Sequence, residues 1–422
     1  MNPRYVSTRG GGAPVSFREA LLQGLAPDGG LFVPTRIPSL PEGWRDAETL
    51  PEMGTRILAP WLAEEVGAAR LGGIVEDALA FPIPLVPLSG EWDGVHILEL
   101  FHGPTLSFKD VGARTMGRLF AWALDGEEVT ILAATSGDTG SAVADGFAGV
   151  PGVRVVLLFP EGQVSEVQRR QLVAQRENVR TLAVRGTFDD CQRLVKAVFA
   201  DPQGARLSSA NSINIGRLLP QMLYYSWGLR AMETPPVVIV PSGNLGNLTA
   251  GMLATEAGLP VRRFIAAHNA NAGFARFLGG GDVPAGDSVR TLSNAMDVGV
   301  PSNLERLRHL HSDEALRQRI AGEWAPDDDT LRTMREVFDA TGYVADPHTA
   351  VGLTAARRES ARLGTPVVVL ATAHPAKFPE AVHRAIGQEP ETPPRLAALM
   401  DAPERFETVT PEVRALRDAL RR

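Results

Sequence analysis

The chain has 422 residues, of which 44% are hydrophobic and 22% are charged, and its formal net charge at pH 7 is −7. This length suits two or three domains, the apolar content is enough for folded cores, and the acidic balance argues against nucleic-acid binding through bulk electrostatics. No apolar run is long enough to span a membrane and the first ten residues lack the apolar stretch of a signal peptide, so we expect a cytoplasmic protein with no membrane partner.

The first ninety or so residues differ from the rest in composition. They are rich in Gly and Pro and end in the proline-rich run Phe81–Pro87. We therefore expect a separate N-terminal unit over residues 1–95 and an α/β core of two subdomains over residues 96–386. Residues 387–422 are expected to form a C-terminal tail that ends in a charged helix.

The region after residue 95 predicts alternating strands and helices. Buried-type strands are expected at Val129–Ala134, Val153–Phe159, Val179–Val184, Val237–Val240, Arg263–Ala267 and Pro366–Ala371. Helices are expected from about Gly140, at Glu166–Gln175 with Ser165 as the N-cap, around Asp189–Phe199, and in the acidic segment Asp327–Thr341. This alternation is typical of α/β layers with a largely parallel sheet, in which ligands bind beyond the carboxyl ends of the strands.

The single cysteine, Cys191, excludes an internal disulfide and a cysteine-rich zinc site. No metal ligands are predicted anywhere in the chain. Because Phe188, Leu194 and Val198 recur around Cys191 at helical spacing, we interpret it as a buried structural thiol on an amphipathic helix.

Only three of the 42 basic residues are lysine, namely Lys109, Lys196 and Lys377. A lysine amine can lose its proton near neutral pH and form a Schiff base, whereas an arginine guanidinium cannot. Genome base composition explains the scarcity of lysine but not the positions at which it is kept. We interpret Lys196, in the amphipathic run Gln192–Phe199, as a solvated side chain, which leaves the other two lysines as candidates for chemistry.

The segment Leu98–Asp110 contains a strand-like stretch, a Gly-Pro turn and the start of a helix that runs through Met116–Trp122. Thr105 or Ser107 can cap this helix, which places Lys109 in its first turn. The helix dipole disfavours a cation there, so the position suits a neutral or imine-linked nitrogen. The alternative is a solvated lysine that pairs with the neighbouring aspartate.

A loop of turn and cap residues follows the first expected strand of the core and opens a helix. Its residues are Thr135, Ser136, Gly137, Asp138 and Thr139. Their hydroxyl and backbone N–H groups can hold a carboxylate at the helix N-terminus. An ordinary strand–turn–helix joint uses the same residue types, and the loop taken alone favours that simpler interpretation.

A second loop joins a buried strand to a helix through Gly243, Asn244, Leu245, Gly246 and Asn247. Glycine lets the backbone approach an anion closely, and a helix N-terminus favours a phosphate. The loop has neither the G-x-G-x-x-G nor the Walker spacing, so a cup for a single phosphate is favoured over a dinucleotide or ATP site.

Two further groups of polar residues are candidates for binding an anionic substrate. Thr372 ends the last expected strand, where its hydroxyl can bond a neutral ring nitrogen, and His374 and Lys377 follow within five positions. Asn214 and Arg217 lie in a run rich in Ser and Asn, and the arginine can hold a phosphate bidentately. The alternatives are a structural imidazole at His374 and helix capping by the Asn and Ser side chains.

Similar segments occur, in chain order, at Tyr5–Gly10, Gly24–Phe32, His102–Thr105, Phe108–Asp110, Thr135–Gly140, Asn211–Arg217, Gly243–Gly246, Ser293–Asp297 and Thr372–Phe378. Together they resemble the short form of threonine synthase, a family of fold type II pyridoxal-phosphate (PLP) enzymes. The resemblance covers nearly the whole chain, and the order of the segments is more specific than any one of them. It implies a tryptophan synthase β-like architecture, with two α/β domains and an N-terminal extension.

The resemblance also implies roles toward the cofactor. Lys109 is expected to form the Schiff base with PLP and to act as acid and base. The loop Gly243–Asn247 is expected to hold the cofactor phosphate, and Thr372 to face the pyridine nitrogen. Asp138 stands where related enzymes carry an asparagine that bonds the ring oxygen of the cofactor, so that contact stays unassigned.

The substrate implied by the resemblance is O-phospho-L-homoserine, which reacts with water to give L-threonine and phosphate by γ-elimination and β-addition, as the last step of threonine biosynthesis. The loop Thr135–Thr139 is expected to hold the substrate carboxylate. Arg217, Asn214, Lys377 and His374 are expected at the substrate phosphate. The sequence does not decide between a monomer and a homodimer.

Three other interpretations compete with this one. Another fold type II enzyme, such as a serine or threonine dehydratase or a lyase acting on a phosphorylated amine, would share the core motifs. The N-terminal block and the segment Ala373–Phe378 favour threonine synthase instead. A binding protein that has lost catalysis is disfavoured by the intact Lys109, and a nucleotide-binding protein by the spacing of the glycine loop.

Overall fold

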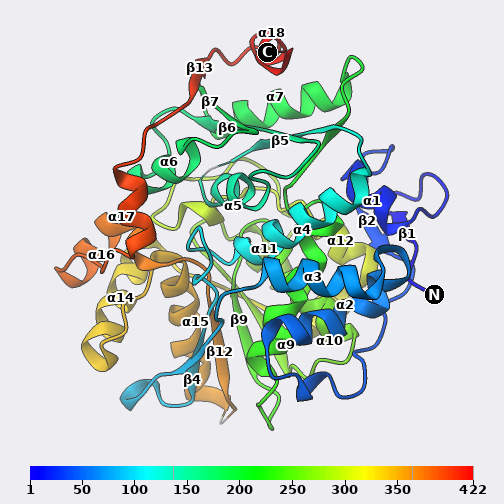
Figure 1. Ribbon diagram of the computed structural model, residues 1–422. Coiled ribbons are helices and arrows are strands. Elements are labelled where there is room, and N and C mark those ends of the chain that lie inside the picture. Colours follow the sequence, from blue (N-terminus) through cyan, green and yellow to red (C-terminus); the bar gives the residue numbers. More distant parts are fainter. Residues whose placement is uncertain (136, 364, 422) are drawn as a thin grey trace.

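The computed structural model describes residues 1–135, 137–363 and 365–421. Within these ranges the strands form two large sheets and a small one, and the two large sheets lie one above the other in Figure 1. The six-stranded sheet has the order β11 (Ile320–Trp324), β10 (Arg263–His268), β9 (Val237–Pro241), β12 (Val367–Ala371), β4 (Val95–Glu99) and β3 (Leu85–Pro87). The five-stranded sheet has the order β13 (Glu407–Val409), β7 (Val179–Val184), β6 (Val153–Pro160), β5 (Val129–Ala134) and β8 (Leu207–Ser208). The small sheet pairs β1 (Tyr5–Ser7) with β2 (Phe32–Pro34).

Both large sheets are almost entirely parallel. Every pair of neighbours in the five-stranded sheet is parallel, and in the six-stranded sheet only β3 runs antiparallel to its neighbour. Every residue of β9 and β12 is buried, as expected for parallel strands covered on both faces. The expected strands and the α/β fold class are therefore confirmed, and the carboxyl ends of the strands meet along one edge of each sheet.

Helices cover the faces of the sheets and build the N-terminal unit (Figure 1). Their bounds are α1 (Phe17–Gln23), α2 (Leu50–Val66), α3 (Ala68–Ala78), α4 (Lys109–Leu124), α5 (Asp138–Gly146), α6 (Glu166–Val173), α7 (Phe188–Ala200), α8 (Ile215–Leu218), α9 (Met222–Leu229), α10 (Gly246–Glu256), α11 (Gly273–Leu278), α12 (Asn303–Leu310), α13 (Asp313–Arg319), α14 (Asp327–Thr341), α15 (Pro347–Leu363), α16 (Pro379–Ile386), α17 (Pro394–Met400) and α18 (Val413–Arg421). Ser165 caps α6 through a complete capping box with Gln168, as its sequence predicts. In the described part of the chain, no helix is both long and apolar enough to cross a membrane.

A buried arginine joins the N-terminal segment to later parts of the chain. Arg306 of α12 is fully buried, and its guanidinium donates to the carbonyl oxygens of Phe32 at 3.1 Å, Ser212 at 3.3 Å and Ile213 at 2.8 Å. These bonds join β2 to the polar run that precedes α8. The N-terminal unit therefore helps to fix a segment that the sequence marks as a candidate for substrate binding.

The C-terminal tail completes the five-stranded sheet. β13 pairs in parallel with β7, and α18 packs against α7 (Figure 1). Cys191 and Leu194 of α7 share one apolar cluster with Leu416 of α18. Burial raises the pKa of the Cys191 thiol to about 12, so this cysteine is a structural thiol, as expected from its helical neighbours.

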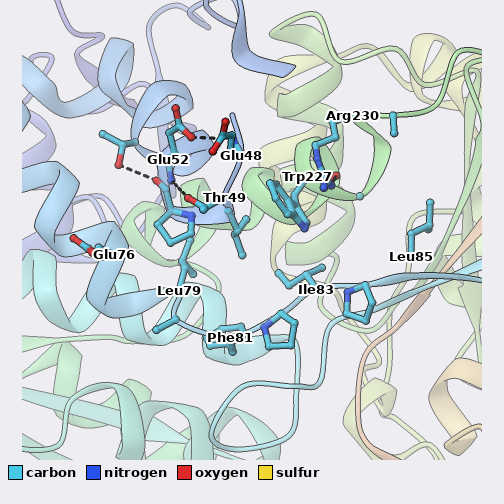
Figure 2. Close-up of a pocket in the computed structure, with 18 of the residues that line it drawn as sticks. Glu48, Thr49, Glu52, Glu76, Leu79, Phe81, Ile83, Leu85, Trp227 and Arg230 are labelled. Atoms are coloured by element: carbon cyan, nitrogen blue, oxygen red, sulfur yellow. Dashed lines mark hydrogen bonds between the residues drawn. The ribbon is translucent and has the colours of Figure 1, made fainter. Parts of the chain in front are cut away.

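A hollow of about 1030 Å³ opens between α2, α3, the segment 79–85 and α9. Figure 2 shows Glu48 and Glu52 on one side of it and Trp227 and Arg230 on the other. The Arg230 guanidinium lies 3.3 Å from the centroid of the Trp227 ring. This hollow shares no lining residue with the cavity that contains Lys109, so we place the chemistry in the latter.

Candidate active site

A cavity of about 730 Å³ lies at the carboxyl ends of the parallel strands. Its lining includes the last residues of β5 and β9, which are Ala134 and Pro241, and Thr372, which directly follows β12. Lys109 lines the same cavity. Ligands of α/β proteins bind at this edge of the sheet, where loops from several strands converge.

The segment before α4 is pinned to the end of β12, which places Lys109 beside Thr372. The N–H of Phe108 donates to the carbonyl oxygen of Thr372 at 2.9 Å, and the N–H of His374 donates to that of Leu106 at 3.1 Å. Leu106 has a positive φ of 59°, which turns the chain into the helix. Ser107 Oγ accepts from the N–H of Lys109 at 3.2 Å. The N-cap of α4 is Phe108, which makes no side-chain cap, so neither Thr105 nor Ser107 is the N-cap residue expected from the sequence.

The amine of Lys109 lies in a mostly buried and strongly charged setting. The side chain is 13% exposed, and its Nζ lies 3.4 Å from Asp138 Oδ2 and 4.9 Å from the centroid of the Phe108 ring. Burial lowers the pKa of Lys109, Asp138 opposes that effect, and the cations Lys377 and Arg217 add to it. The net lowering favours a neutral amine, the form that acts as a nucleophile or a base.

The loop before α10 forms a cup at the helix N-terminus. Leu245 has a left-handed backbone with φ 59°, and α10 begins at Gly246. Asn244 is held by three contacts: its Nδ2 donates to Ser212 Oγ at 2.9 Å, its Oδ1 accepts from the N–H of Ser302 at 2.6 Å, and its carbonyl oxygen accepts from Asn303 Nδ2 at 3.0 Å. The first N–H groups of a helix have no intrahelical acceptor, so this geometry suits a bound anion.

Three buried polar atoms on residues that line the cavity have no hydrogen-bond partner among the described residues. They are Arg217 Nε, Asn211 Oδ1 and Asn247 Nδ2. The Oδ1 of Asn247 is occupied, since it accepts from the hydroxyls of Tyr224 at 2.8 Å and Tyr225 at 2.6 Å. Buried polar atoms in native proteins are nearly always paired, so these three indicate a polar ligand in the cavity.

The loop after β5 divides into residues that reach the cavity and residues that build the turn. Thr139 and Asp138 line the cavity, whereas Thr135 Oγ1 accepts from two backbone N–H groups, including that of Gly137 at 3.0 Å. Ser136 lies outside the described residues. Burial opposes the ionisation of Asp138, but Lys377, Lys109 and His348 hold its pKa well below the usual range. Both carboxylate oxygens of Asp138 already face lysine amines, so the N–H and hydroxyl groups of this loop are the parts that suit a substrate carboxylate.

Asn214, His374 and Lys377 do not line the cavity. Asn214 caps α8: its Nδ2 donates to the carbonyl oxygens of Leu21 and Ser209, both at 2.9 Å, and its Oδ1 accepts from Gly216. His374 Nδ1 likewise accepts from a backbone N–H two residues later. For these two side chains the capping and structural alternatives account for every contact that the structure gives.

Other residues at the cavity were not predicted as ligands. His348 lines it and is held in one orientation, because its Nδ1 lies 2.7 Å from Asp346 Oδ1 and its Nε2 accepts from the N–H of Ala295 at 3.1 Å. The sequence Asp346-Pro-His-Thr carries a helix-start signal but nothing that marks a ligand. Lys196, expected to be solvated, is exposed and also lines the cavity from α7.

Comparisons with known proteins agree over the whole chain. Three family models match it: threonine synthase N terminus over residues 4–79, pyridoxal-phosphate dependent enzyme over residues 79–373, and threonine synthase, C-terminal, over residues 349–420. The threonine synthase of Serratia marcescens is 42% identical over 400 residues, which are 92% of each chain. That of Escherichia coli K12 is 41% identical over 414 residues, which are 96% of each chain.

The chain belongs to the threonine synthase family. The solved structure of PLP-bound threonine synthase from Brucella melitensis covers 100% of this chain and 99% of its own, with a TM-score of 0.92 and 36% identity. Threonine synthase from Escherichia coli has a TM-score of 0.91 at 39% identity. Maize serine racemase, at 16% identity and a TM-score of 0.55, shares the fold alone.

PLP is the cofactor of this threonine synthase family member, and the residues of the cavity fit it. The cofactor carries a phosphate, an aldehyde carbon and a pyridine nitrogen. The N-terminus of α10 and the free Nδ2 of Asn247 suit the phosphate. Lys109 offers a buried amine to the aldehyde, and Thr372 lines the same cavity with a hydroxyl.

Gly243 packs closely against the backbone of a neighbouring segment. A Cβ added at Gly243 would lie 2.9 Å from Met296 Cα and 3.1 Å from the carbonyl oxygen of Ala295. Both are backbone atoms, so Gly243→Ala must displace the loop, and we expect PLP affinity to fall at least tenfold, about 1.4 kcal/mol. The measurement is a titration of the apoprotein with PLP by absorbance.

Gly73→Ala is the matched control, because nothing lies within 4 Å of a Cβ at that position in α3. We expect this control to bind PLP like the unmodified protein and to be slightly more stable, because alanine favours a helix. Equal PLP affinities of the two variants would contradict the placement of the cofactor at this loop.

Proposed function

We propose that the protein converts O-phospho-L-homoserine and water to L-threonine and phosphate. The observation that carries the proposal is the cavity in which the buried amine of Lys109, the helix N-terminus at Gly246 and the unpaired Nε of Arg217 lie together. The buried amine and the anion cup suit PLP, which reacts with amino acids, and the free cationic donor suits a phosphate on the substrate. Membership of the threonine synthase family supports the same substrate.

Gly243, Asn244, Leu245, Gly246 and Asn247 would hold the cofactor phosphate. Thr372 would bond the pyridine nitrogen through its hydroxyl, a neutral partner that leaves this nitrogen less protonated than a carboxylate would. When bound, PLP supplies an electron sink that stabilises negative charge at the carbon atoms next to its linkage with the substrate.

Lys109 is the proposed base and acid of the reaction. Its Nζ, neutral because of burial, takes the proton from Cα of the substrate and later returns a proton to the product. Thr139 and the N–H groups at the start of α5 bind the substrate carboxylate, since a helix N-terminus favours an anion. The carboxylate of Asp138 faces Lys109 rather than this anion.

Arg217 is the proposed partner of the substrate phosphate. Its side chain is 3% exposed, its Nη1 donates to the carbonyl oxygen of Ala210 at 2.5 Å, and its Nε is free. Burial lowers the pKa of Arg217 to about 10, and Asp110 opposes that effect, so the guanidinium stays charged at neutral pH. It can stabilise the phosphate that leaves Cγ once a proton has been removed from Cβ. Cγ then takes up a proton, and water adds at Cβ.

The test is an assay of purified protein with PLP and O-phospho-L-homoserine, in which phosphate and amino acids are both quantified. Equal amounts of L-threonine and phosphate are expected. Phosphate accompanied by 2-oxobutyrate would instead indicate a lyase on the same scaffold. No phosphate release from a protein that binds PLP would contradict the proposed substrate.

We propose the cytoplasm as the location and the small molecule O-phospho-L-homoserine as the partner. The lone thiol of Cys191 is buried on α7, which is compatible with a reducing compartment. Gel filtration with light scattering decides between a monomer and a homodimer.

A further inference from the structure

Two of the three lysines of the chain face one buried carboxylate. Asp138 Oδ1 lies 2.8 Å from Lys377 Nζ and accepts from Gln168 Nε2 at 3.1 Å, while Asp138 Oδ2 lies 3.4 Å from Lys109 Nζ. The side chains of Asp138 and Lys377 are 2% and 0% exposed. Lys377 does not line the cavity, and its amine contacts the carboxylate of Asp138 behind the cavity wall.

The segment around Lys377 is built to hold this amine in place. The short helix η5 (Pro375–Lys377) follows His374, whose carbonyl oxygen accepts from the N–H of Lys377 at 3.1 Å. The carbonyl oxygen of Lys377 accepts from Ser165 Oγ at 3.4 Å. Its Nζ also donates to the carbonyl oxygen of Thr105 at 2.9 Å. Hydrogen bonds thus hold both the backbone and the amine of Lys377 in place, which gives the run Ala373–Lys377 a structural role.

A carboxylate beside Lys109 favours the protonated form of its amine, and a second cation offsets that effect. An aspartate within about 4–6 Å of a lysine favours the ammonium form and raises the lysine pKa by roughly 1–3 units. A base must instead be neutral to accept a proton. Lys377 lies closer to Asp138 than Lys109 does. The Asp138–Lys377 ion pair therefore presents no net charge to Lys109.

We propose that Lys377 is a positioning residue that cancels the charge of Asp138, so that this carboxylate orients the amine of Lys109 without holding a proton on it. The proposal rests on the proposed function, in which Lys109 is the base. Arg217 of α8 adds a further positive charge facing Lys109, and His348 of α15 adds to the attraction on Asp138.

The remaining acidic neighbour does not replace Asp138. Asp110 follows Lys109 on α4, but its Oδ2 accepts from the N–H of Thr105 at 2.8 Å and its Oδ1 from the Thr105 hydroxyl at 2.5 Å. Burial raises the pKa of Asp110 to about 6, although its hydrogen bonds with Thr105 act to lower that pKa. Asp138 is therefore the carboxylate in contact with Lys109, and Lys377 is the cation in contact with that carboxylate.

The test is a lysine titration in the full chain without PLP or substrate. Protein labelled with 13C at lysine Cε gives three lysine signals, because the chain has three lysines. Lys109→Arg and Lys377→Met each remove one signal and so assign all three. The pKa of Lys109 then follows from its chemical shift against pH.

Lys377→Met should raise the pKa of Lys109 by about 1–3 units, since Asp138 is then uncompensated. Asp138→Asn should lower the pKa of Lys109, since the cation Lys377 remains. The double variant should return it to within about half a unit of the unmodified protein. In the PLP-loaded protein, where substrate releases the Lys109 amine from the cofactor, the acid limb of kcat against pH should move upward in Lys377→Met.

Arg263→Met is the control, because it removes one positive charge from an exposed position at the opposite, amino end of β10. It should leave the pKa of Lys109 unchanged. A purely structural Lys377 would lower the melting temperature of Lys377→Met without moving that pKa, and this result would overturn the proposal. If Lys377→Met does not fold, equal Lys109 pKa values in Asp138→Asn and the double variant would overturn it as well.

The proposed function and the proposed role of Lys377 can be contradicted independently of each other. The titration needs neither substrate nor turnover, so the expected pKa pattern without threonine formation would contradict only the proposed function. Threonine formation with a Lys109 pKa that ignores Lys377 would contradict only the role of the Asp138–Lys377 pair.

Discussion

Lys109→Ala should reduce threonine formation from O-phospho-L-homoserine by at least about 10³-fold, because it removes the only proposed base and the amine that faces the cofactor. Phosphate release should fall by the same factor, since the proton transfer that Lys109 performs precedes departure of the phosphate. The measurement is kcat for both products at saturating PLP. The variant should still bind PLP, because the cup at α10 is intact.

Lys109→Arg is the sharper comparison, because it keeps a long basic side chain near Asp138 and Phe108 but cannot release a proton near neutral pH. We expect it to be as inactive as the alanine variant. Borohydride reduction of the PLP-loaded unmodified protein should label Lys109 in a peptide map, and neither variant should be labelled. Substantial activity in either variant would remove Lys109 from the mechanism.

Arg217→Ala should raise KM for O-phospho-L-homoserine by about 10–100-fold, because a hydrogen bond to a charged group contributes roughly 1.5–3 kcal/mol. The guanidinium lies in the cavity wall with its Nε unpaired, so its loss removes a binding partner rather than an internal ion pair. The measurement is KM together with the inhibition constant of inorganic phosphate. Both should rise.

PLP affinity separates this effect from damage to the cofactor cup, and it should change little in Arg217→Ala. Arg263→Ala, at the exposed start of β10, is the matched control and should keep both constants. A rise in KM with unchanged inhibition by phosphate would indicate that Arg217 contacts another part of the substrate.

Much of this fold could be predicted because local patterns and tertiary packing agree. Val129–Ala134 and Val179–Val184 are apolar runs bounded by turn residues, and the structure has strands over the same bounds. Ser165 marks the start of α6 by a capping box that the sequence displays. The start of a helix was harder to predict where no side chain caps it. α5 has no side-chain cap and begins at Asp138, two residues before the expected Gly140.

The candidate site could be predicted only in part, because binding and capping use the same side chains. Asn214 and Arg217 stand three residues apart in one polar run, yet the first caps α8 and the second lines the cavity and has an unpaired Nε. Lys377 was expected at the substrate phosphate, but its amine is turned toward Asp138. His348 carries no local signal, because its place at the cavity depends on a contact with Ala295 from a distant loop.

The order of strands in the six-stranded sheet has a consequence for how the enzyme is made. β4 ends just before Lys109, but its parallel neighbour β12 and the adjoining Thr372 are encoded roughly 270 residues later, which at about 5–20 residues per second means tens of seconds of synthesis. Throughout that time a nascent chain on the ribosome carries Lys109 without the segment to which its loop is pinned. Loading of the cofactor is therefore a late event, available only to chains that are nearly complete.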